Sequence, residues 1–293
     1  MIPSDEPLVL DVRRFALDDG PGIRSVVFLK GCPLACAWCH NPEAIRPEAE
    51  MVFHADRCLD CGGCTATCPR QAVLSRPTRL VRARCAACGL CADACPTLAL
   101  VKRGEAVAVE TLVQRLLVDR VLYETSGGGV TFSGGEPTLH GPYLACALRR
   151  LRQEGVSVTL ETCGLFDLRF FLAELLPHLD RIYFDVKFID EGLHRRYTGS
   201  GNRAILRNLA ALAEAAPRRL TPRVPLVQGI TAREENLSAI AGHLRRLGLD
   251  RAVPLPYHPG GLAKRRTLGL PIPLEVPDTM LPAADQARWA RLL

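Results

Sequence analysis

The sequence has no long uncharged apolar segment. None of its apolar runs reaches the roughly 18 residues that a transmembrane helix requires, so no membrane-spanning helix is predicted. The first residues, MIPSDEPLVLDVRRF, are acidic early and lack the apolar stretch of a secretory signal peptide. We therefore expect a cytoplasmic protein with no membrane partner.

A concentrated basic stripe is also missing. The net charge is +6, but lysine and arginine are spread along the chain, and the densest cluster, AKRR at residues 263–266, is short. Nucleic-acid binding is therefore not predicted. We interpret the scattered charge as a solvated surface, with a docking surface for an acidic electron donor as the alternative.

Cysteine, in contrast, is abundant, with 13 among 293 residues. A disulfide framework is disfavoured because the cytoplasm is reducing. Eleven of these cysteines fall into three closely spaced groups, a pattern typical of metal sites. The first group has the spacing C-x3-C-x2-C and consists of Cys32, Cys36 and Cys39.

The second and third groups share the run C-x2-C-x2-C-x3-C-P, at residues 58–69 and 85–96. In bacterial ferredoxins the fourth cysteine of each such run ligates the other cluster. This pattern assigns one 4Fe–4S cluster to Cys58, Cys61, Cys64 and Cys95, and a second to Cys85, Cys88, Cys91 and Cys68. Zinc is the alternative for paired cysteines, but it prefers two pairs separated by a loop.

The first group supplies only three thiolates, so a 4Fe–4S cluster bound there keeps one iron open. An open coordination position is how a metal site admits a substrate or cofactor. Of the two remaining cysteines, Cys146 lies in an apolar helical pattern and is predicted to be a core residue. Cys163 lies at a predicted strand end; we expect it to be buried and inert, with a place near the site as the alternative.

Outside residues 51–103, short apolar runs alternate with amphipathic segments. Strands are expected at residues 25–30, 129–133, 156–161, 181–187, 223–228 and 252–257, and helices near 110–124, 141–154, 168–177, 203–215 and 233–247. This alternation predicts an α/β fold with a parallel sheet and right-handed crossovers, either a partial (β/α)6 TIM-like barrel or an open sheet. We favour the partial barrel, formed by residues 1–50 and 104–293, with residues 51–103 as an inserted ferredoxin-like domain that holds two clusters.

Glycine and polar motifs follow the expected strands. They are the cysteine loop, GGEP at 134–137, ETCG at 161–164, DVK at 185–187 and YHPGG at 257–261. Since ligands bind at the carboxyl ends of parallel strands, these motifs are expected to face one cleft. Gly134 and Gly135 would expose backbone N–H and C=O groups, Lys187 would hold a carboxylate, and Asp185 a cation or hydroxyls. The ligand so described is a small zwitterion that chelates iron, as an amino acid derivative does.

The motifs also support a family resemblance. The segments DDGPGIRSVVFLKGCPLACAWCHNPE, SGGEPTL, FDVKFID, YTGSGNRAILRNL, VPLVQGIT and PYHPGG span residues 18–261. The C-x3-C-x2-C and GGEP motifs resemble the radical S-adenosylmethionine superfamily. The full set is similar to the glycyl-radical-enzyme activating enzymes, in the branch that inserts a two-cluster domain after the first strand and loop.

This resemblance implies a cofactor set and a reaction. S-adenosylmethionine would chelate the open iron, and its reductive cleavage would yield a 5′-deoxyadenosyl radical that takes a hydrogen from a glycine of a partner glycyl radical enzyme. Three 4Fe–4S clusters and an electron donor such as flavodoxin or ferredoxin are implied. We interpret the two extra clusters as an electron conduit, with a purely structural role as the alternative.

The resemblance also implies roles for individual residues. The implied catalytic residues are Cys32, Cys36, Cys39, Lys187 and His258. The implied contacts of S-adenosylmethionine are Trp38, Asn41, Gly134, Gly135, Glu136, Asp185, Lys187, Arg223 and His258. The family meets the partner's glycine loop, or a monovalent cation, at positions that correspond here to Asp19, Gly20, Glu161 and Thr162.

Two rival functions are kept beside the activating enzyme. One is a radical S-adenosylmethionine enzyme that acts on a small molecule or peptide. The motifs DGPGIR and HNPE argue against this function. The other is a non-catalytic Fe–S electron carrier, which would bind clusters without cleaving the cofactor.

Overall fold

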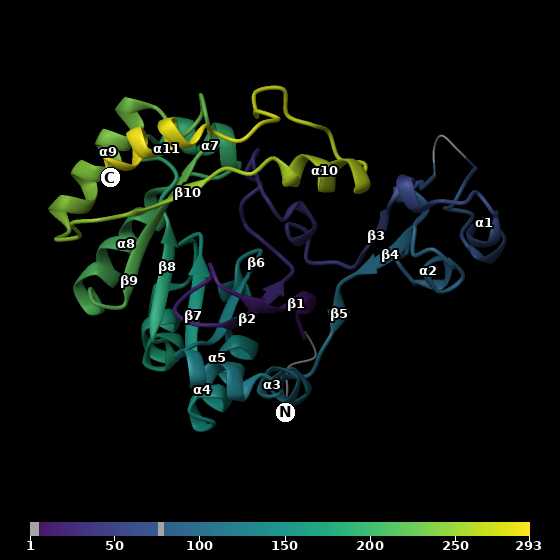
Figure 1. The fold of residues 1–293 in the computed structure, drawn as a ribbon, viewed down its shortest axis with the longest axis horizontal. Coiled ribbons are helices and arrows are strands. Elements are labelled where there is room, and N and C mark those ends of the chain that lie inside the picture. Colours follow the sequence, from purple (N-terminus) through teal and green to yellow (C-terminus); the bar gives the residue numbers. More distant parts are fainter. Residues whose placement is uncertain (1–5, 76–78) are drawn as a thin grey trace.

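The computed structural model of the protein (Figure 1) describes residues 6–75 and 79–293, and an eight-stranded sheet forms its centre. The strand order is β10-β9-β8-β7-β6-β2-β1-β5. The strands of this sheet are β1 (Leu8–Ala16), β2 (Arg24–Leu29), β5 (Glu105–Ala106), β6 (Gly129–Gly134), β7 (Ser157–Thr162), β8 (Arg181–Asp185), β9 (Leu220–Leu226) and β10 (Val253–Pro256). From β2 to β10 neighbours pair in parallel, whereas β1 and β5 pair antiparallel.

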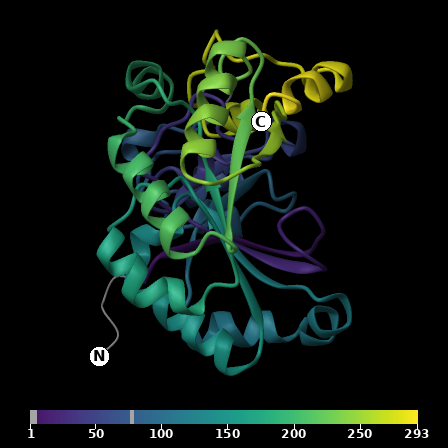
Figure 2. The same ribbon diagram turned by 90° about the vertical axis from the view of Figure 1, so that its left-hand side faces the viewer.

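Helices connect the parallel strands and flank them, as the green and teal ribbons in Figure 2 show. They are α3 (Val109–Leu117), α4 (Arg120–Ser126), α5 (Gly141–Gln153), α6 (Leu168–Phe170), α7 (Glu191–Thr198), α8 (Arg203–Ala215), α9 (Glu234–Arg246), α10 (Gly260–Thr267) and α11 (Ala283–Ala290). Helix α6 continues as a π-helical turn, Phe171–Leu175, and a 3₁₀ turn, Leu176–His178. Within the described ranges, no helix combines the length and apolarity needed to cross a bilayer.

The predicted α/β partial barrel is confirmed, and all six predicted strands are present within a few residues of their expected ends. The prediction missed β1 and β5, which lie antiparallel at one edge and follow no strand–helix–strand alternation. The expected helix at 110–124 is in fact two helices. The break between them carries Asp119, whose buried carboxylate accepts hydrogen bonds from Ser25 and Arg14.

A buried arginine secures the loop between β1 and β2. Arg24 is fully buried and donates hydrogen bonds to Thr131 Oγ1 at 2.7 Å, Val130 O at 2.6 Å and Pro21 O at 3.2 Å. Thr131 in turn donates to the carbonyl of Asp19 at 2.7 Å. Burial lowers the pKa of Arg24 to about 10, so the side chain stays charged at neutral pH. The segment DGPGIR is thereby held against β6.

Residues 50–103 form a separate small layer that projects to the right of the sheet in Figure 1. It contains the antiparallel pair β3 (Glu50–Phe53) and β4 (Leu100–Arg103) and the short helices α1 (Gly63–Thr67) and α2 (Leu90–Asp93). Its buried apolar cluster consists of Met51, Cys64, Val73, Cys91 and Leu100. Two of these five are predicted cluster ligands, so the cysteines make up a large part of this small core.

Helix α8 supports the loop that follows β7 through the side chain of Asn208. Its buried amide donates to Gly164 O at 2.9 Å and Phe166 O at 3.0 Å. We expect Asn208→Ala to lower the free energy of unfolding by about 2 kcal/mol, because both carbonyls lose their donor. Urea unfolding measures this, with the exposed Glu214→Ala on the same helix as a control that changes stability by less than about 0.5 kcal/mol. Equal effects of the two substitutions would contradict the prediction.

Candidate active site

The loop that carries the first cysteine group follows β2 and is held by backbone hydrogen bonds. Cys32 N donates to Ile45 O at 2.9 Å, Ala35 N to Thr198 O at 2.8 Å, and Ala37 N to Tyr197 O at 2.9 Å. The C-terminal end of helix α7 therefore supports one side of the loop, and Ile45, which follows the loop closely in the sequence, supports the other. Cys36 is buried, while Cys32 and Cys39 are half-buried. The three predicted ligands thus lie on one loop whose backbone is fixed by its neighbours.

Burial and a neighbouring thiol determine the pKa values of these three cysteines in the metal-free protein. It raises the pKa of Cys36 to about 12 and that of Cys39 to about 11. The pKa of Cys32 is lowered, first by a hydrogen bond with the thiol of Cys163. A bound cation would favour the thiolate form of all three cysteines. Cys163 is buried, as predicted, and it also lies beside the site, which was the alternative.

Trp38 and Asn41 lie at the far end of the cysteine loop. The indole of Trp38 is buried and meets the rings of Phe188 at 6.1 Å and Tyr197 at 6.3 Å between centroids. Asn41 Oδ1 accepts a hydrogen bond from Lys264 Nζ at 2.7 Å. Lys264, on helix α10, is a contact that the sequence analysis did not anticipate, because it lies 223 residues away along the chain.

The glycine loop after β6 packs directly against the cysteine loop. Strands β2 and β6 end at the same level, since Leu29 pairs with Gly134. Beyond this pair, Gly135 N donates to Leu29 O at 2.8 Å and Glu136 N donates to Gly31 O at 2.7 Å. A Cβ atom on Gly135 would lie 2.0 Å from Gly31 O, so only glycine fits. The sequence analysis expected the N–H of Gly135 to face a ligand, but this N–H is occupied by Leu29 O because the two loops pack directly on each other.

Glu136 joins the glycine loop to the end of β7. Its side chain is fully buried. One carboxylate oxygen accepts from Thr138 Oγ1 at 2.7 Å, both accept from Thr162 Oγ1 at 2.9 Å, and the other accepts from Cys163 N at 2.6 Å. Every donor around the carboxylate belongs to one of these two loops. The structure thus brings together Glu136, predicted as a cofactor contact, and Thr162, predicted at the cation or glycine-loop position, and the two side chains are hydrogen-bonded to each other.

Charged side chains from β7, β8 and β9 form a connected group inside the barrel. Arg223 Nη1 bonds Glu161 at 2.6 Å, Arg223 Nη2 bonds Asp185 at 3.2 Å, and Lys187 Nζ bonds Asp185 at 3.3 Å. The guanidinium of Arg223 also lies 4.8 Å from the ring centroid of Tyr183. This group contains four of the predicted site residues.

The same contacts fix the charges of the group. Burial alone would raise the pKa of Asp185, but Lys187 and then Arg223 outweigh it, so that pKa lies below its usual value. Burial would likewise lower the pKa values of Lys187 and Arg223, but Asp185 reverses this and both are raised. The two positive charges and the Asp185 carboxylate therefore persist at neutral pH. Such a set can bind the carboxylate and amino ends of a zwitterion.

Asp19 and Gly20 lie in the loop held by Arg24, and Asp19 is close enough to Glu161 and Arg223 to interact with their charges. Burial, followed by the nearby Glu161 carboxylate, raises the pKa of Asp19. A Cβ atom on Gly20 would lie 2.6 Å from Cδ of Arg24, so the arginine requires a glycine there. The structure thus places Asp19 near Glu161.

His258 lies at the rim of the site. It is exposed, its Nδ1 accepts from Gly260 N at 3.0 Å, and its ring meets that of His40 edge-on with centroids 5.7 Å apart. A Cβ atom on Gly261 would lie 2.2 Å from Cys39 O, so the PYHPGG segment packs closely on the cysteine loop. His258 is therefore on the segment that covers the site's outer edge.

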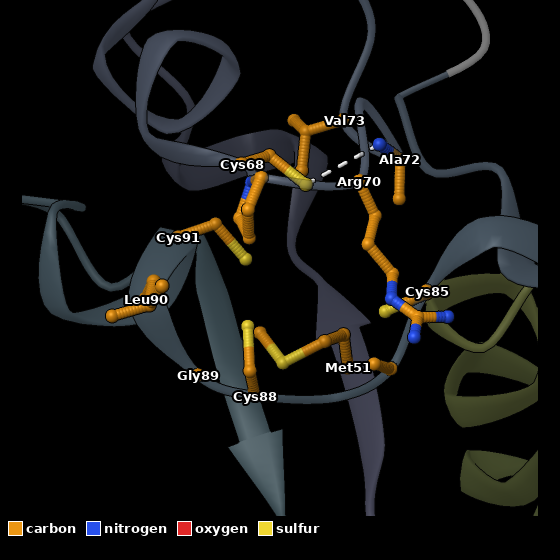
Figure 3. Close-up of a pocket in the computed structure, with 12 residues that line it drawn as sticks. Met51, Cys68, Arg70, Ala72, Val73, Cys85, Cys88, Gly89, Leu90 and Cys91 are labelled. Carbon is orange, nitrogen blue, oxygen red and sulfur yellow. Dashed lines mark hydrogen bonds between the residues drawn. The ribbon is translucent and has the colours of Figure 1, made fainter.

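The eight cysteines of the projecting layer surround two cavities. Cys68, Cys85, Cys88 and Cys91 line one of about 100 Å³, shown in Figure 3, and Cys58, Cys61, Cys64 and Cys95 line the other. Each set contains the fourth cysteine of the other run, as the ferredoxin spacing predicts. Within residues 6–75 and 79–293, no three His, Cys, Asp or Glu side chains converge on a single-ion site. Four thiols around one cavity form a donor set that fits a 4Fe–4S cluster.

Glu136→Gln tests the brace between the glycine loop and β7. An amide nitrogen would face donors that need an acceptor, so we expect a loss of about 2 kcal/mol in unfolding free energy. S-adenosylmethionine binding should weaken as well, because both loops border the predicted site. Thermal unfolding and calorimetric binding measure the two effects. The exposed Glu235→Gln on helix α9 serves as the control and should leave both unchanged.

Comparison with known proteins agrees with this geometry. Residues 18–206 match the family described as a 4Fe-4S single cluster domain. The chain is 38% identical over 257 residues to the trans-4-hydroxy-L-proline dehydratase activating enzyme of Clostridioides difficile, covering 86% of this chain and 84% of the relative. It is 39% identical over 275 residues to the (2S)-3-sulfopropanediol sulfolyase activating enzyme of Bilophila wadsworthia, covering 92% and 90%.

A solved structure shares the fold. A radical S-adenosylmethionine methyltransferase from Sphaerobacter thermophilus superposes with a TM-score of 0.55 at 15% identity, covering 98% of this chain and 74% of that one. The relatives, the cysteine loop and the fold together imply S-adenosylmethionine and an iron–sulfur cluster as cofactors. The chain belongs to the glycyl-radical-enzyme activating enzymes of the radical S-adenosylmethionine superfamily, which generate the radical on a partner glycyl radical enzyme.

Proposed function

We propose that this activating enzyme holds its catalytic 4Fe–4S cluster on Cys32, Cys36 and Cys39 and leaves the fourth iron to S-adenosylmethionine. The observation that carries the proposal is the direct packing of the cysteine loop on the glycine loop through Gly135 N and Glu136 N. When bound, the cluster and the cofactor supply the radical chemistry that removes a hydrogen atom from the partner's glycine. The chain's own residues position and shield that chemistry.

The charged group is the proposed binding surface for the methionine end of the cofactor. Lys187 and Arg223 are buried and remain positive, so they are suited to a carboxylate. Asp185 and the carbonyl of Gly135 are suited to an ammonium group. Glu136 acts by bracing the loops, because its oxygens are already occupied.

The remaining site residues are assigned to the adenosyl end and to the partner. Trp38, Asn41 and His258 lie toward the outer segment and are proposed to border the adenosyl group. Asp19, together with Gly20, is proposed to meet the partner's glycine loop. A monovalent cation at Glu161 and Thr162 would compete with Arg223, which already bonds the Glu161 carboxylate.

Residues 51–103 are proposed as an inserted domain with two further 4Fe–4S clusters, giving three in all. Each cavity of this domain is lined by four thiols. The segment contains eight basic and three acidic residues, which accounts for most of the chain's net charge of +6. We therefore propose that it receives electrons from an acidic carrier such as flavodoxin or ferredoxin. Thiolate-held clusters require a reducing compartment, so we place the enzyme in the cytoplasm.

Cys36→Ala tests the proposed function. Wild-type protein should bind about twelve irons per chain and the variant about eight, since only the catalytic cluster is lost. With reductant, S-adenosylmethionine and a partner glycyl radical enzyme, wild type should give the doublet signal of a glycyl radical in electron paramagnetic resonance. The variant should give neither that doublet nor 5′-deoxyadenosine, whereas Cys146→Ala, which changes a half-buried cysteine of the barrel, should behave as wild type.

The rival functions give different results in the same experiment. Cofactor cleavage without a glycyl doublet would favour an enzyme that acts on a small molecule or peptide. A protein that binds iron but never forms 5′-deoxyadenosine would be an electron carrier.

A further inference from the structure

The two halves of the projecting domain repeat the same backbone contacts with their cysteines. In each half, the amide two residues after the first cysteine donates to its sulfur, and the amide four residues after the fourth cysteine does the same. The pairs are Asp60 N with Cys58 Sγ at 3.4 Å, Ala87 N with Cys85 Sγ at 3.4 Å, Ala72 N with Cys68 Sγ at 3.3 Å, and Ala99 N with Cys95 Sγ at 3.2 Å. The backbone therefore treats the two predicted clusters alike.

One side chain breaks this symmetry. Arg79 is 5% exposed and lies over the ring of Phe53, 5.7 Å from its centroid. Its Nη2 donates to Cys58 Sγ at 3.3 Å, and its Nη1 donates to Asp60 Oδ1 at 3.0 Å and Leu74 O at 3.3 Å. The guanidinium is thus clamped beside the first cysteine of one set only.

The third donor of Arg79 has no acceptor. Its Nε is buried and has no hydrogen-bond partner among the described residues. The side chain also lines the cavity surrounded by Cys58, Cys61, Cys64 and Cys95. A buried N–H without an acceptor destabilises a fold. A cluster held in that cavity would supply sulfur atoms as acceptors close to this side chain.

Among the described residues, no buried arginine or lysine donates a hydrogen bond to a cysteine sulfur of the other half, although the guanidinium of Arg70 lies beside Cys85 in Figure 3. Ala87 stands where Asp60 stands in the first half, so no carboxylate is present there to clamp an arginine. Arg70 lines the cavity of that half, but it is exposed, and water screens its charge. The cysteine set of Cys58, Cys61, Cys64 and Cys95 has a second side-chain contact as well, because Thr97 Oγ1 lies 3.7 Å from Cys95 Sγ.

We propose that Arg79 raises the reduction potential of the cluster held by Cys58, Cys61, Cys64 and Cys95 above that of its neighbour. Reduction adds negative charge to a cluster, and a buried cation that donates hydrogen bonds to its sulfur atoms stabilises that charge. Asp60 opposes this effect, but its side chain is 55% exposed whereas that of Arg79 is 4% exposed. Solvent therefore weakens the carboxylate's influence more than the arginine's.

The position of this cluster assigns a role in electron transfer to the difference between the two reduction potentials. Helix α1, which carries Cys64, lies at the outer end of the projecting domain in Figure 1. The second cavity lies on the side of the barrel, where Arg82, three residues before Cys85, donates to Thr267 O of helix α10 at 3.4 Å. The outer cluster is thus the one that is reduced first and holds an electron at the donor side. This inference rests on the proposal that the domain binds two clusters.

The test compares the two midpoint potentials in full-length protein. Cys32, Cys36 and Cys39 are replaced by alanine, so that only the clusters of the inserted domain contribute to a redox titration followed by electron paramagnetic resonance. Cys61→Ala and Cys88→Ala, at equivalent exposed positions in the two halves, assign the two signals. We expect Arg79→Leu to lower the midpoint potential of the cluster that Cys61→Ala removes and to leave the other unchanged.

A matched control and two further variants complete the design. Arg57→Leu removes the same charge next to Cys58 from an exposed side chain and should shift neither potential. If Arg79→Leu prevents assembly of the cluster, Arg79→Gln should lower the potential and Arg79→Lys should largely retain it. Unchanged potentials in Arg79→Gln, or equal shifts of both clusters, would overturn the inference. Fewer than about eight irons per chain in the background protein would instead contradict the two-cluster proposal itself.

Discussion

Two backbone hydrogen bonds join the end of β2 and the start of the following loop to the loop after β6, and the arrangement of the site depends on them. Gly135 N donates to Leu29 O, and Glu136 N donates to Gly31 O. They bring the cysteine loop and the glycine loop to one edge of the sheet. They also leave no space for a side chain at Gly135, whose Cβ would meet Gly31 O. The glycine is thus required first by the packing of two loops, and a ligand can use only what that packing leaves free.

Buried charges extend this arrangement across the barrel, and each is compensated. Glu136 is satisfied by hydroxyl and amide donors from the adjoining loops, whereas Asp185 and Glu161 are satisfied by Arg223 and Lys187. Removing one partner of such a group leaves an uncompensated charge in a region with little water, which is costly. The charged group therefore holds a fixed geometry before any cofactor binds, and this limits the reorganisation that binding requires.

Regular patterns made much of this molecule predictable from its sequence. Six parallel strands followed from apolar runs, and the two sets of four cysteines followed from spacing alone. Strand β1 was not predicted because it lies in the antiparallel part of the sheet, near its edge, where much of its surface is exposed. Arg13 and Arg14 also interrupt its apolar pattern. Lys264 and Arg79 were missed for another reason. Their partners lie 223 and 21 residues away, and no local pattern connects them.

The conduit and structural roles of the two proposed clusters are compatible. Cys64 and Cys91 are buried together with Met51, Val73 and Leu100, so the thiols proposed to hold the clusters also contribute to the core. A domain this small would gain much of its stability from metal, and clusters bound for electron transfer would supply that stability at the same time. Structural need alone, however, would be met by two equivalent halves. Among the described residues, the hydrogen bond from buried Arg79 to Cys58 is not repeated in the other half, and we infer that this difference sets apart the reduction potentials of the two proposed clusters.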